Sequence, residues 1–267
     1  MLYYKNDKFK IYKQDNLEVL KQLPENYVDL IYCDILYNTG RKFKDYDDNL
    51  GTPQEAILWY EPRLYEMRRV LKETGSIYLH MDFRLVHYLK VKMDEIFGYS
   101  NFVNEIIWTY GLGNNNKKTS WQCKHDNILM YRKSSHFTWN EPRGKVTEEM
   151  VKKYCHIDEN GKYMISYGKK YYLKGGKRVS DIWDDTSNLS ATDSNRNGYD
   201  TQKPKSLLER IIKASSSPND IVADFFMGSG TTGEASVELG RRFIGCDINE
   251  RACEITKNRI LNLKESA

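Results

Sequence analysis

One stretch of ten residues constrains the fold of this chain more than any other. Residues 224–233 read Asp-Phe-Phe-Met-Gly-Ser-Gly-Thr-Thr-Gly, between an apolar run at 221–223 and a helix-forming run at 234–239. We therefore expect a strand, a glycine turn and a helix in succession, which is the geometry of a nucleotide-type cofactor site. Gly228 and Gly230 allow the backbone to bend tightly and approach a ligand closely, and the first N–H groups of the following helix face the turn.

The segment 243–247, Phe-Ile-Gly-Cys-Asp, is expected to form a second strand that ends in an acid. A carboxylate at this position accepts the ribose hydroxyls in doubly wound nucleotide-binding folds. Gly228-x-Gly230-x-x-Gly233 with Asp247 about 20 residues further on also matches the dinucleotide fingerprint of dehydrogenases. That fingerprint normally opens its domain, whereas only 34 residues follow Gly233 here. A dehydrogenase is therefore an alternative that nicotinamide binding would test.

The upstream half of the chain contains a second motif. The apolar run 27–33 leads into Asp34-Ile35-Leu36-Tyr37, and Thr-Gln-Lys-Pro stands at 201–204. The order of Asp-x-x-Tyr, a variable region, Gln-Lys-Pro and Phe-x-Gly-x-Gly resembles that of β-group S-adenosylmethionine-dependent DNA amino-methyltransferases of bacterial restriction–modification systems. Their first motif is Asp-Pro-Pro-Tyr, and the resemblance covers roughly 8–134 and 181–262.

The resemblance implies an α/β fold with a doubly wound, mostly parallel sheet of seven strands, circularly permuted, and a small inserted target-recognition region. Alternation of strand and helix patterns independently favours a mostly parallel sheet covered on both faces. We expect strands at 8–12, 28–33, 76–81, 102–109, 126–132, 220–225 and 242–247, and helices at 16–22, 54–72, 84–97, 204–215, 231–239 and 249–262. Pro62 is expected to kink or split the second helix.

The chain is expected to divide into a catalytic half (1–134), a target-recognition insertion (135–200) and a cofactor-binding half (201–267). Within the insertion, Asn160-Gly161 and Gly175-Gly176 each predict the turn of a hairpin. From Tyr110 to Ser180 the chain has 15 Lys and Arg against 6 Asp and Glu, and the remainder has 26 against 31. This asymmetry favours a surface that faces a polyanion over general solubility, with a solvated basic face as the alternative.

The family motif implies roles for three residues at 34–37. The Asp34 carboxylate and the Ile35 carbonyl would accept the N–H groups of the target amine, and Tyr37 would stack on a base flipped out of double-stranded DNA. Because Asp heads the motif, adenine N6 is the expected target, with cytosine N4 as the alternative. Ile35 and Leu36 replace both prolines of the family motif, so a catalytically silent DNA-binding homologue is the alternative from another class.

The resemblance also implies the residues that bind S-adenosylmethionine and DNA. The expected cofactor residues are Asp15 and Asn16 at the adenine edge, Asp34, Lys203 for the carboxylate, Phe225 and Phe226, Gly228, Ser229 and Gly230 beneath the methionine part, Thr231 as helix cap or carboxylate ligand, Asp247 for the ribose, and Ile248 and Asn249 beside the adenine. The residues expected to contact DNA phosphates are Lys117, Lys118, Lys124, Arg132 and Lys133. The histidines show no metal-ligand spacing, so no metal is expected.

Composition bounds the location of the protein. No apolar run approaches the ~20 residues of a membrane helix, and the first residues lack the apolar core of a signal peptide. Five cysteines without paired spacing fit a reducing cytoplasm. The family often dimerises and accompanies restriction enzymes, so a homodimer and a cognate restriction endonuclease are the further partners that the resemblance suggests.

Overall fold

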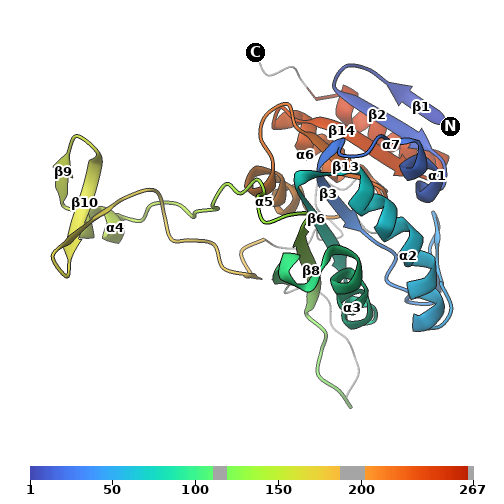
Figure 1. The fold of residues 1–267 in the computed structure, drawn as a ribbon, viewed down its shortest axis with the longest axis horizontal. Helices are drawn as coiled ribbons and strands as arrows, with labels where there is room; N and C mark the ends of the chain where they lie inside the picture. The colour runs from blue at the N-terminus through green and yellow to red at the C-terminus, as the bar shows by residue number, and fades with distance from the viewer. Residues whose placement is uncertain (111–118, 187–201, 264–267) are drawn as a thin grey trace. The chain divides into compact units, whose positions relative to one another are not determined.

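The computed structural model describes residues 1–110, 119–186 and 202–263. The chain forms two compact units, of which the smaller is Asn140–Ser180 and the larger contains the residues on either side of it. The larger unit carries the central sheet and its helices (Figure 1).

Among the described residues, nine strands form one sheet in the order β1-β2-β14-β13-β3-β6-β8-β7-β12. These strands are β1 (Leu2–Lys5), β2 (Phe9–Lys13), β3 (Val28–Asp34), β6 (Leu71–Met81), β7 (Phe102–Thr109), β8 (His125–Arg132), β12 (Ile182–Trp183), β13 (Ile221–Asp224) and β14 (Arg242–Asp247). The pairs from β2 to β6 are parallel, whereas β8 runs antiparallel to both of its neighbours. The expected seven-stranded, mostly parallel sheet is confirmed, and β1 and β12 extend its two edges.

The sheet brings the two ends of the chain together. β14 pairs in parallel with β2, from Phe243 opposite Phe9 to Asp247 opposite Lys13. β13 lies between β14 and β3, so the loops that follow β13 and β3 both emerge at the carboxyl ends of these parallel strands. This is the circularly permuted order that the resemblance implied.

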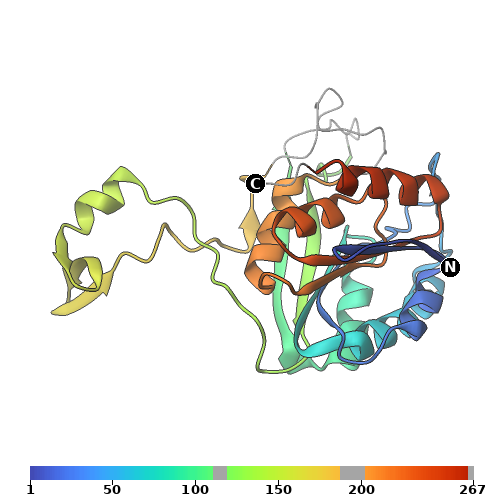
Figure 2. The same ribbon diagram turned by 90° about the horizontal axis from the view of Figure 1, so that it is seen from above.

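Helices cover both faces of the sheet (Figure 2). One face carries α1 (Asn16–Gln22), α2 (Pro53–Val70) and α3 (Val86–Phe97), followed by the 3₁₀ turn η1 (Tyr99–Asn101), and the other carries α5 (Lys205–Ser215), α6 (Thr231–Glu238) and α7 (Glu250–Leu261). α2 is continuous through Pro62, so the expected split is absent. Its buried face includes Tyr60 and Leu64 on either side of the proline, and this packing holds the helix together.

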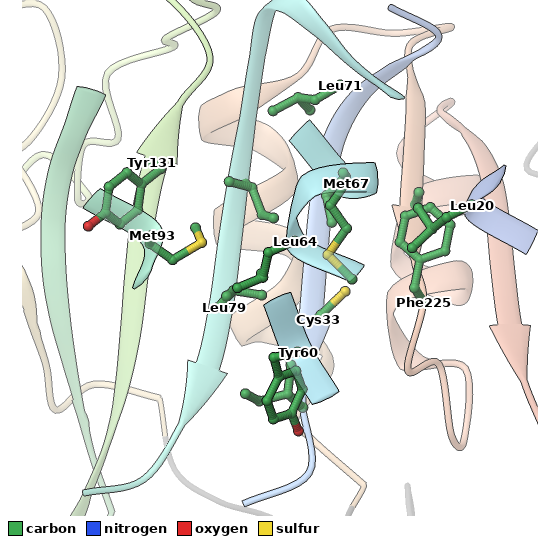
Figure 3. Close-up of a cluster of buried hydrophobic side chains, with 14 of the residues drawn as sticks. Leu20, Cys33, Tyr60, Leu64, Met67, Leu71, Leu79, Met93, Tyr131 and Phe225 are labelled. Atoms are coloured by element: carbon green, nitrogen blue, oxygen red, sulfur yellow. The ribbon is translucent and has the colours of Figure 1, made fainter. Parts of the chain in front are cut away.

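The main core lies between the first three helices and the sheet (Figure 3). Leu64 and Met67 of α2 pack with Cys33 of β3 and Leu79 of β6 in one buried cluster. β3 is buried from Val28 to Cys33, because helices cover both of its faces. An apolar run without alternation is typical of such a strand.

The smaller unit contains α4 (Glu148–Lys153) and a sheet of β9 (His156–Asp158), β10 (Gly161–Ser166) and β11 (Lys169–Tyr172). The hairpin predicted at Asn160-Gly161 is present between β9 and β10. In this fully described segment, Gly176 is the one buried residue, and Ile157 is 74% exposed. The unit therefore has no apolar core of its own.

The second predicted hairpin is wrong. β10 turns into β11 at Tyr167-Gly168, where both residues have positive φ, and Gly175-Gly176 lies outside the sheet. A Cβ at Gly176 would stand 2.3 Å from the carbonyl oxygens of Gly144 and Lys145. Glycine at this position permits close backbone approach, and the sequence pattern does not distinguish that role from a turn.

Candidate active site

A cavity of about 380 Å³ opens at the carboxyl ends of β3, β13 and β14. Asp34 and the Gly228–Ser229 loop both border it, although they lie far apart in the sequence. Open α/β sheets bind ligands beside the carboxyl ends of their strands, at the point where neighbouring connections leave on opposite faces of the sheet. The short hairpin of β4 (Arg41–Lys42) and β5 (Asp47–Asp48) contributes further lining residues, which the sequence did not predict.

The glycine loop has the expected turn geometry. Gly228 and Gly230 have φ of +45° and +73°, a region that side chains other than glycine rarely adopt. A Cβ at Gly230 would also lie 2.4 Å from the Thr256 hydroxyl. Gly230 is the N-cap of α6, so the loop leads directly from strand to helix.

Asp247 is held at the end of β14 by two backbone donors. Its oxygens accept from the N–H groups of Gly228 at 3.0 Å and Asn249 at 2.8 Å. Burial raises the pKa of Asp247 to about 6, against the opposing effect of these hydrogen bonds. Since each carboxylate oxygen has more than one acceptor site, the group retains capacity for two ribose hydroxyls.

Thr231 does not cap α6, because Gly230 holds that position and Thr231 is the first helical residue. Its hydroxyl accepts from the Arg259 guanidinium at 3.0 Å, and Thr231 borders the cavity. The capping role predicted for Thr231 is therefore wrong. A helix N-terminus after glycine can begin at either residue, and the sequence does not decide between them.

Asn249 caps α7, with its side-chain oxygen accepting from the Arg251 N–H at 2.8 Å. Its amide donates to the Asp45 carbonyl at 2.6 Å. The cavity lining includes Ile248 but not Asn249. The side chain of Asn249 is committed to the cap and to the loop before β5, and its contact with the cofactor stays a prediction.

Asp15 and Asn16 border the cavity and are held by Arg63 of α2. Asp15 caps α1 and pairs with Arg63 at 2.7 Å. Asn16 accepts from Arg63 at 2.7 Å and donates to the Phe225 carbonyl at 3.1 Å. Sequence reasoning missed Arg63, which holds both of these cavity residues in place. Its signal is an arginine at a position that helical periodicity places on the otherwise apolar buried face of α2.

The two phenylalanines after β13 have different surroundings. Phe225 is buried in the main core, and Phe226 packs beside Trp59 and Tyr60 with ring centroids 6.2 Å apart in each pair. Both border the cavity, so they combine a packing role with an apolar wall for a ligand.

Asp34 is the last residue of β3, and three side chains surround its carboxylate. The Tyr37 hydroxyl donates to Oδ1 at 2.9 Å, and the Lys203 ammonium lies 2.8 Å from Oδ2. His80 of β6 lies opposite Asp34 in the sheet register, with Nδ1 4.0 Å from Oδ1. The Asp-x-x-Tyr spacing thus brings the acid and the ring together, while Lys203 comes from the segment before α5.

The chain holds the 34–37 motif without proline. The Ile35 N–H donates to the His80 carbonyl at 3.2 Å, and the Ile35 side chain is buried. The Leu36 carbonyl accepts from the Tyr60 hydroxyl at 2.8 Å. Proline fixes φ but has no N–H to donate, so these bonds and the packing of Ile35 supply the restraint that the two prolines give in the family motif.

A buried network behind Tyr37 was not predicted. Asp126 of β8 accepts from the hydroxyls of Tyr37 at 3.2 Å and Tyr110 at 3.0 Å, and lies 3.2 Å from His80 Nε2. Burial acts to raise the pKa of Asp126, but His80, Lys203 and Tyr110 together hold that pKa below its usual range. His80 is fully buried, and its Nδ1 lies 2.8 Å from the Tyr32 hydroxyl. Ionisable residues within apolar strands were the available signal.

Comparison with known proteins identifies the family. Residues 28–258 match the family model described as DNA methylase. The chain belongs to this family. It is 35% identical to the Type II methyltransferase M.HpaI of Haemophilus parainfluenzae over 91% of this chain and 71% of that protein. It is 30% identical to the DNA adenine methyltransferase YhdJ of Escherichia coli over 96% of this chain and 83% of that one.

Solved structures have the same fold as this DNA methylase. The cytosine-N4-specific PvuII DNA methyltransferase superposes with a TM-score of 0.67 at 17% identity, covering 99% of this chain and 89% of that one. The M1.HpyAVI–SAM complex superposes with a TM-score of 0.61 at 22% identity, covering 96% and 100%. At these identities the likeness concerns the fold alone.

Two of the residues predicted to contact DNA phosphates, Arg132 and Lys133, lie toward the end of the sheet opposite the cavity. Arg132 lies opposite Ser76, four positions along β6 from His80, which is about 13 Å toward the other end of the sheet. It donates to the Ser100 carbonyl at 3.1 Å. Lys133 is buried, with its ammonium donating to the Leu71 carbonyl at 2.6 Å. The prediction for Lys133 is wrong, because its side chain is buried and its ammonium is held by backbone carbonyls. The phosphate contact of Arg132 stays a prediction.

Lys117 and Lys118 lie outside the described residues. Lys124 is half-buried just before β8, where its carbonyl accepts from the Tyr110 N–H at 3.0 Å, and its phosphate contact stays a prediction. Within the described residues, no group of His, Cys, Asp and Glu is arranged to hold a metal ion. A search of the same residues finds no helix with the length and apolarity to cross a bilayer.

Proposed function

We propose that this DNA methylase transfers a methyl group from S-adenosylmethionine to N6 of an adenine flipped out of double-stranded DNA. The observation that carries the proposal is that Asp34, Tyr37, the glycine loop and Asp247 border one cavity. The name of the Escherichia coli relative, DNA adenine methyltransferase, supports the choice of base.

The residues of the cavity fit the donor. Its volume of about 380 Å³ lies in the usual range for cofactor sites. Asp247 offers acceptors for a ribose, while Phe225 and Ile248 offer apolar contact to a purine ring. When bound, S-adenosylmethionine supplies a methyl group that its sulfonium has already activated. The protein has then to align the acceptor nitrogen with that methyl.

The residues at 34–37 prepare the acceptor. An exocyclic amine is a poor nucleophile because its lone pair is delocalised into the ring. Acceptance of its two N–H groups by the Asp34 carboxylate and the Ile35 carbonyl directs the lone pair toward the donor. The same carboxylate stabilises the positive charge that develops on nitrogen. Hydrogen bonds from the Tyr37 hydroxyl to Asp34 and Asp126 fix the ring on which the base stacks.

One experiment separates the alternatives. DNA is incubated with the methylase and isotope-labelled S-adenosylmethionine, digested to nucleosides and analysed by mass spectrometry. We expect N6-methyladenine, whereas N4-methylcytosine would overturn the choice of base. DNA binding without any labelled nucleoside would identify a silent homologue, and Asp34→Ala provides the inactive control.

The remaining partners are also proposals. We assign target recognition to residues 135–200, and phosphate contacts to Lys117, Lys118 and Lys124. DNA as the substrate of a bacterial-type enzyme makes the cytoplasm its expected location.

A homodimer would supply a second DNA-binding surface, which sedimentation at several protein concentrations tests. A cognate restriction endonuclease is proposed from the Type II relatives.

A further inference from the structure

Lys203 has an exceptional position in the cavity. Among the described residues that border it, Lys203 is the one cationic side chain, whereas five are aspartates. Its side chain is 14% exposed, and its ammonium lies 2.8 Å from Asp34 Oδ2. The same ammonium lies 5.2 Å from the centroid of the Tyr37 ring. The ammonium of Lys203 therefore lies beside both the Asp34 carboxylate and the Tyr37 ring, the two groups that the proposed function assigns to binding of the target base.

This position conflicts with the chemistry proposed for Asp34. The target amine becomes positively charged on methylation, and an unpaired carboxylate stabilises that charge. A lysine cation paired with the same carboxylate repels the new positive charge instead. The base also needs the face of Tyr37. Lys203 therefore has to leave Asp34 before the target amine is bound, and a buried cation needs another anionic partner.

The donor itself can provide that partner. S-adenosylmethionine carries a carboxylate, and the described cavity lining offers it no cation besides Lys203. Lysine has a flexible four-carbon stem, so its ammonium can turn while the backbone before α5 stays in place. Asp34 and the Gly228–Ser229 loop border the same cavity as Lys203, so both partners of the exchange lie within one cavity.

We propose that Lys203 exchanges partners, from the Asp34 carboxylate to the carboxylate of the bound donor, and thereby frees Asp34 for the target base. This inference rests on the proposed function and deepens it. Lys203 acts as a positioning residue that couples the two ligands. Because such coupling is reciprocal, donor binding strengthens the hold on the flipped base, and the base strengthens the hold on the donor.

The test compares two unreactive ligands that differ in the amino-acid part, which includes the carboxylate. S-adenosylhomocysteine retains it, and 5′-methylthioadenosine lacks the whole amino-acid part. The affinity of the full chain for an unmethylated duplex that contains the recognised sequence is measured by fluorescence anisotropy, without ligand and with each ligand at saturation. We expect S-adenosylhomocysteine to tighten DNA binding about 10-fold and 5′-methylthioadenosine to leave it unchanged. Equal tightening by both ligands would overturn the exchange.

The variant Lys203→Met removes the cation that is exchanged. It is expected to bind the duplex tightly without ligand and to gain nothing further from S-adenosylhomocysteine, and a gain equal to the wild type would overturn the inference. Lys205→Met is the matched control, because Lys205 pairs with Glu238 at 2.7 Å outside the cavity lining. The control should keep the wild-type response, and thermal melting verifies that both variants fold.

Failure of this inference differs from failure of the proposed function. Methyl transfer by the wild type, together with equal effects of the two ligands, would remove the exchange and leave the methyltransferase intact. Absence of any methylated nucleoside would remove the proposed function itself.

Discussion

The two walls of the cavity are built in different ways. On the cofactor wall, Asp247 accepts hydrogen bonds from the N–H groups of Gly228 and Asn249. Gly228 lies in the loop after the neighbouring strand β13, and Asn249 follows Asp247 by two residues. On the target wall, Asp34 pairs with Lys203, and Tyr37 hydrogen-bonds to Asp126, and both partners come from distant parts of the chain. The part of the cofactor wall around Asp247 is thus a local structure, whereas the part around Asp15 and Asn16 and the whole target wall form only after distant segments have come together. Because the two walls rest on different contacts, a substitution on one should leave the structure of the other intact, and Lys203 is the proposed link between the two ligands.

The largest expected effect is that of Asp34→Ala on the target wall. The variant loses the acceptor of the amine and its stabilising charge, so methyl transfer should fall by roughly 10³-fold. Donor affinity, measured by calorimetry, should not fall, because Asp247 and the glycine loop are untouched and Lys203 no longer has Asp34 as a competing partner. Loss of donor binding together with transfer would break the comparison, and retained transfer would refute the role of Asp34.

Asp247→Asn gives the reverse pattern on the cofactor wall. Hydrogen bonds to a charged group contribute about 1.5–3 kcal/mol each, so the donor dissociation constant should rise by roughly 30-fold. Transfer at saturating donor should change little. The pKa of Asp247 is raised to about 6, so wild-type donor affinity should decline as the pH falls through 6 and the carboxylate gains a proton. The variant should lack this dependence, and a variant with the same pH profile would contradict the assignment.

A smaller effect is expected for Asp126→Asn, behind the target wall. The substitution weakens the hydrogen bond that orients Tyr37, so single-turnover transfer should fall about 10-fold with unchanged donor affinity. Because the pKa of Asp126 is held below its usual range, the residue stays ionised above pH 5 and should add no inflection between pH 5 and 8. Tyr110→Phe removes one bond to the same carboxylate and should have a weaker effect. An unaltered rate in Asp126→Asn would confine the network to a structural role.

The smallest effect on function should come from Lys133→Met, outside both walls. The substitution leaves the Leu71 carbonyl and the Asn26 side chain without their donor, which should lower the free energy of unfolding by about 2 kcal/mol. Methyl transfer and the salt dependence of DNA binding should stay as in the wild type. Lys124→Met should instead reduce the salt slope by about 1 without a comparable loss of stability. A reduced slope in Lys133→Met would restore it as a phosphate contact.

The sequence predicted the sheet well because its strands and helices have distinct apolar patterns. It also predicted the glycine turn and the position of Asp247, since each depends on residues close in the chain. The order of the strands came from the resemblance, and the pairing of β14 with β2 confirms it.

The rest of the site depends on sheet register and long-range contact. His80 reaches Asp126 because β6 and β8 pair antiparallel with particular residues opposite each other, and no local pattern encodes that alignment. Lys133 was predicted as a surface cation because charge alone does not reveal burial. The turn at Tyr167-Gly168 was missed since a non-glycine residue adopts positive φ there, while Gly175-Gly176 is the stronger turn signal.

The lack of an apolar core in Asn140–Ser180 has a consequence for evolution. Packing constrains a protein's divergence most where side chains are buried, and this segment has almost none. Its residues can be replaced, lengthened or exchanged with those of a relative while the packed sheet and the cavity beside it stay the same. Given the target recognition proposed for residues 135–200, recombination of this short segment would change the recognised DNA sequence without loss of the inherited chemistry.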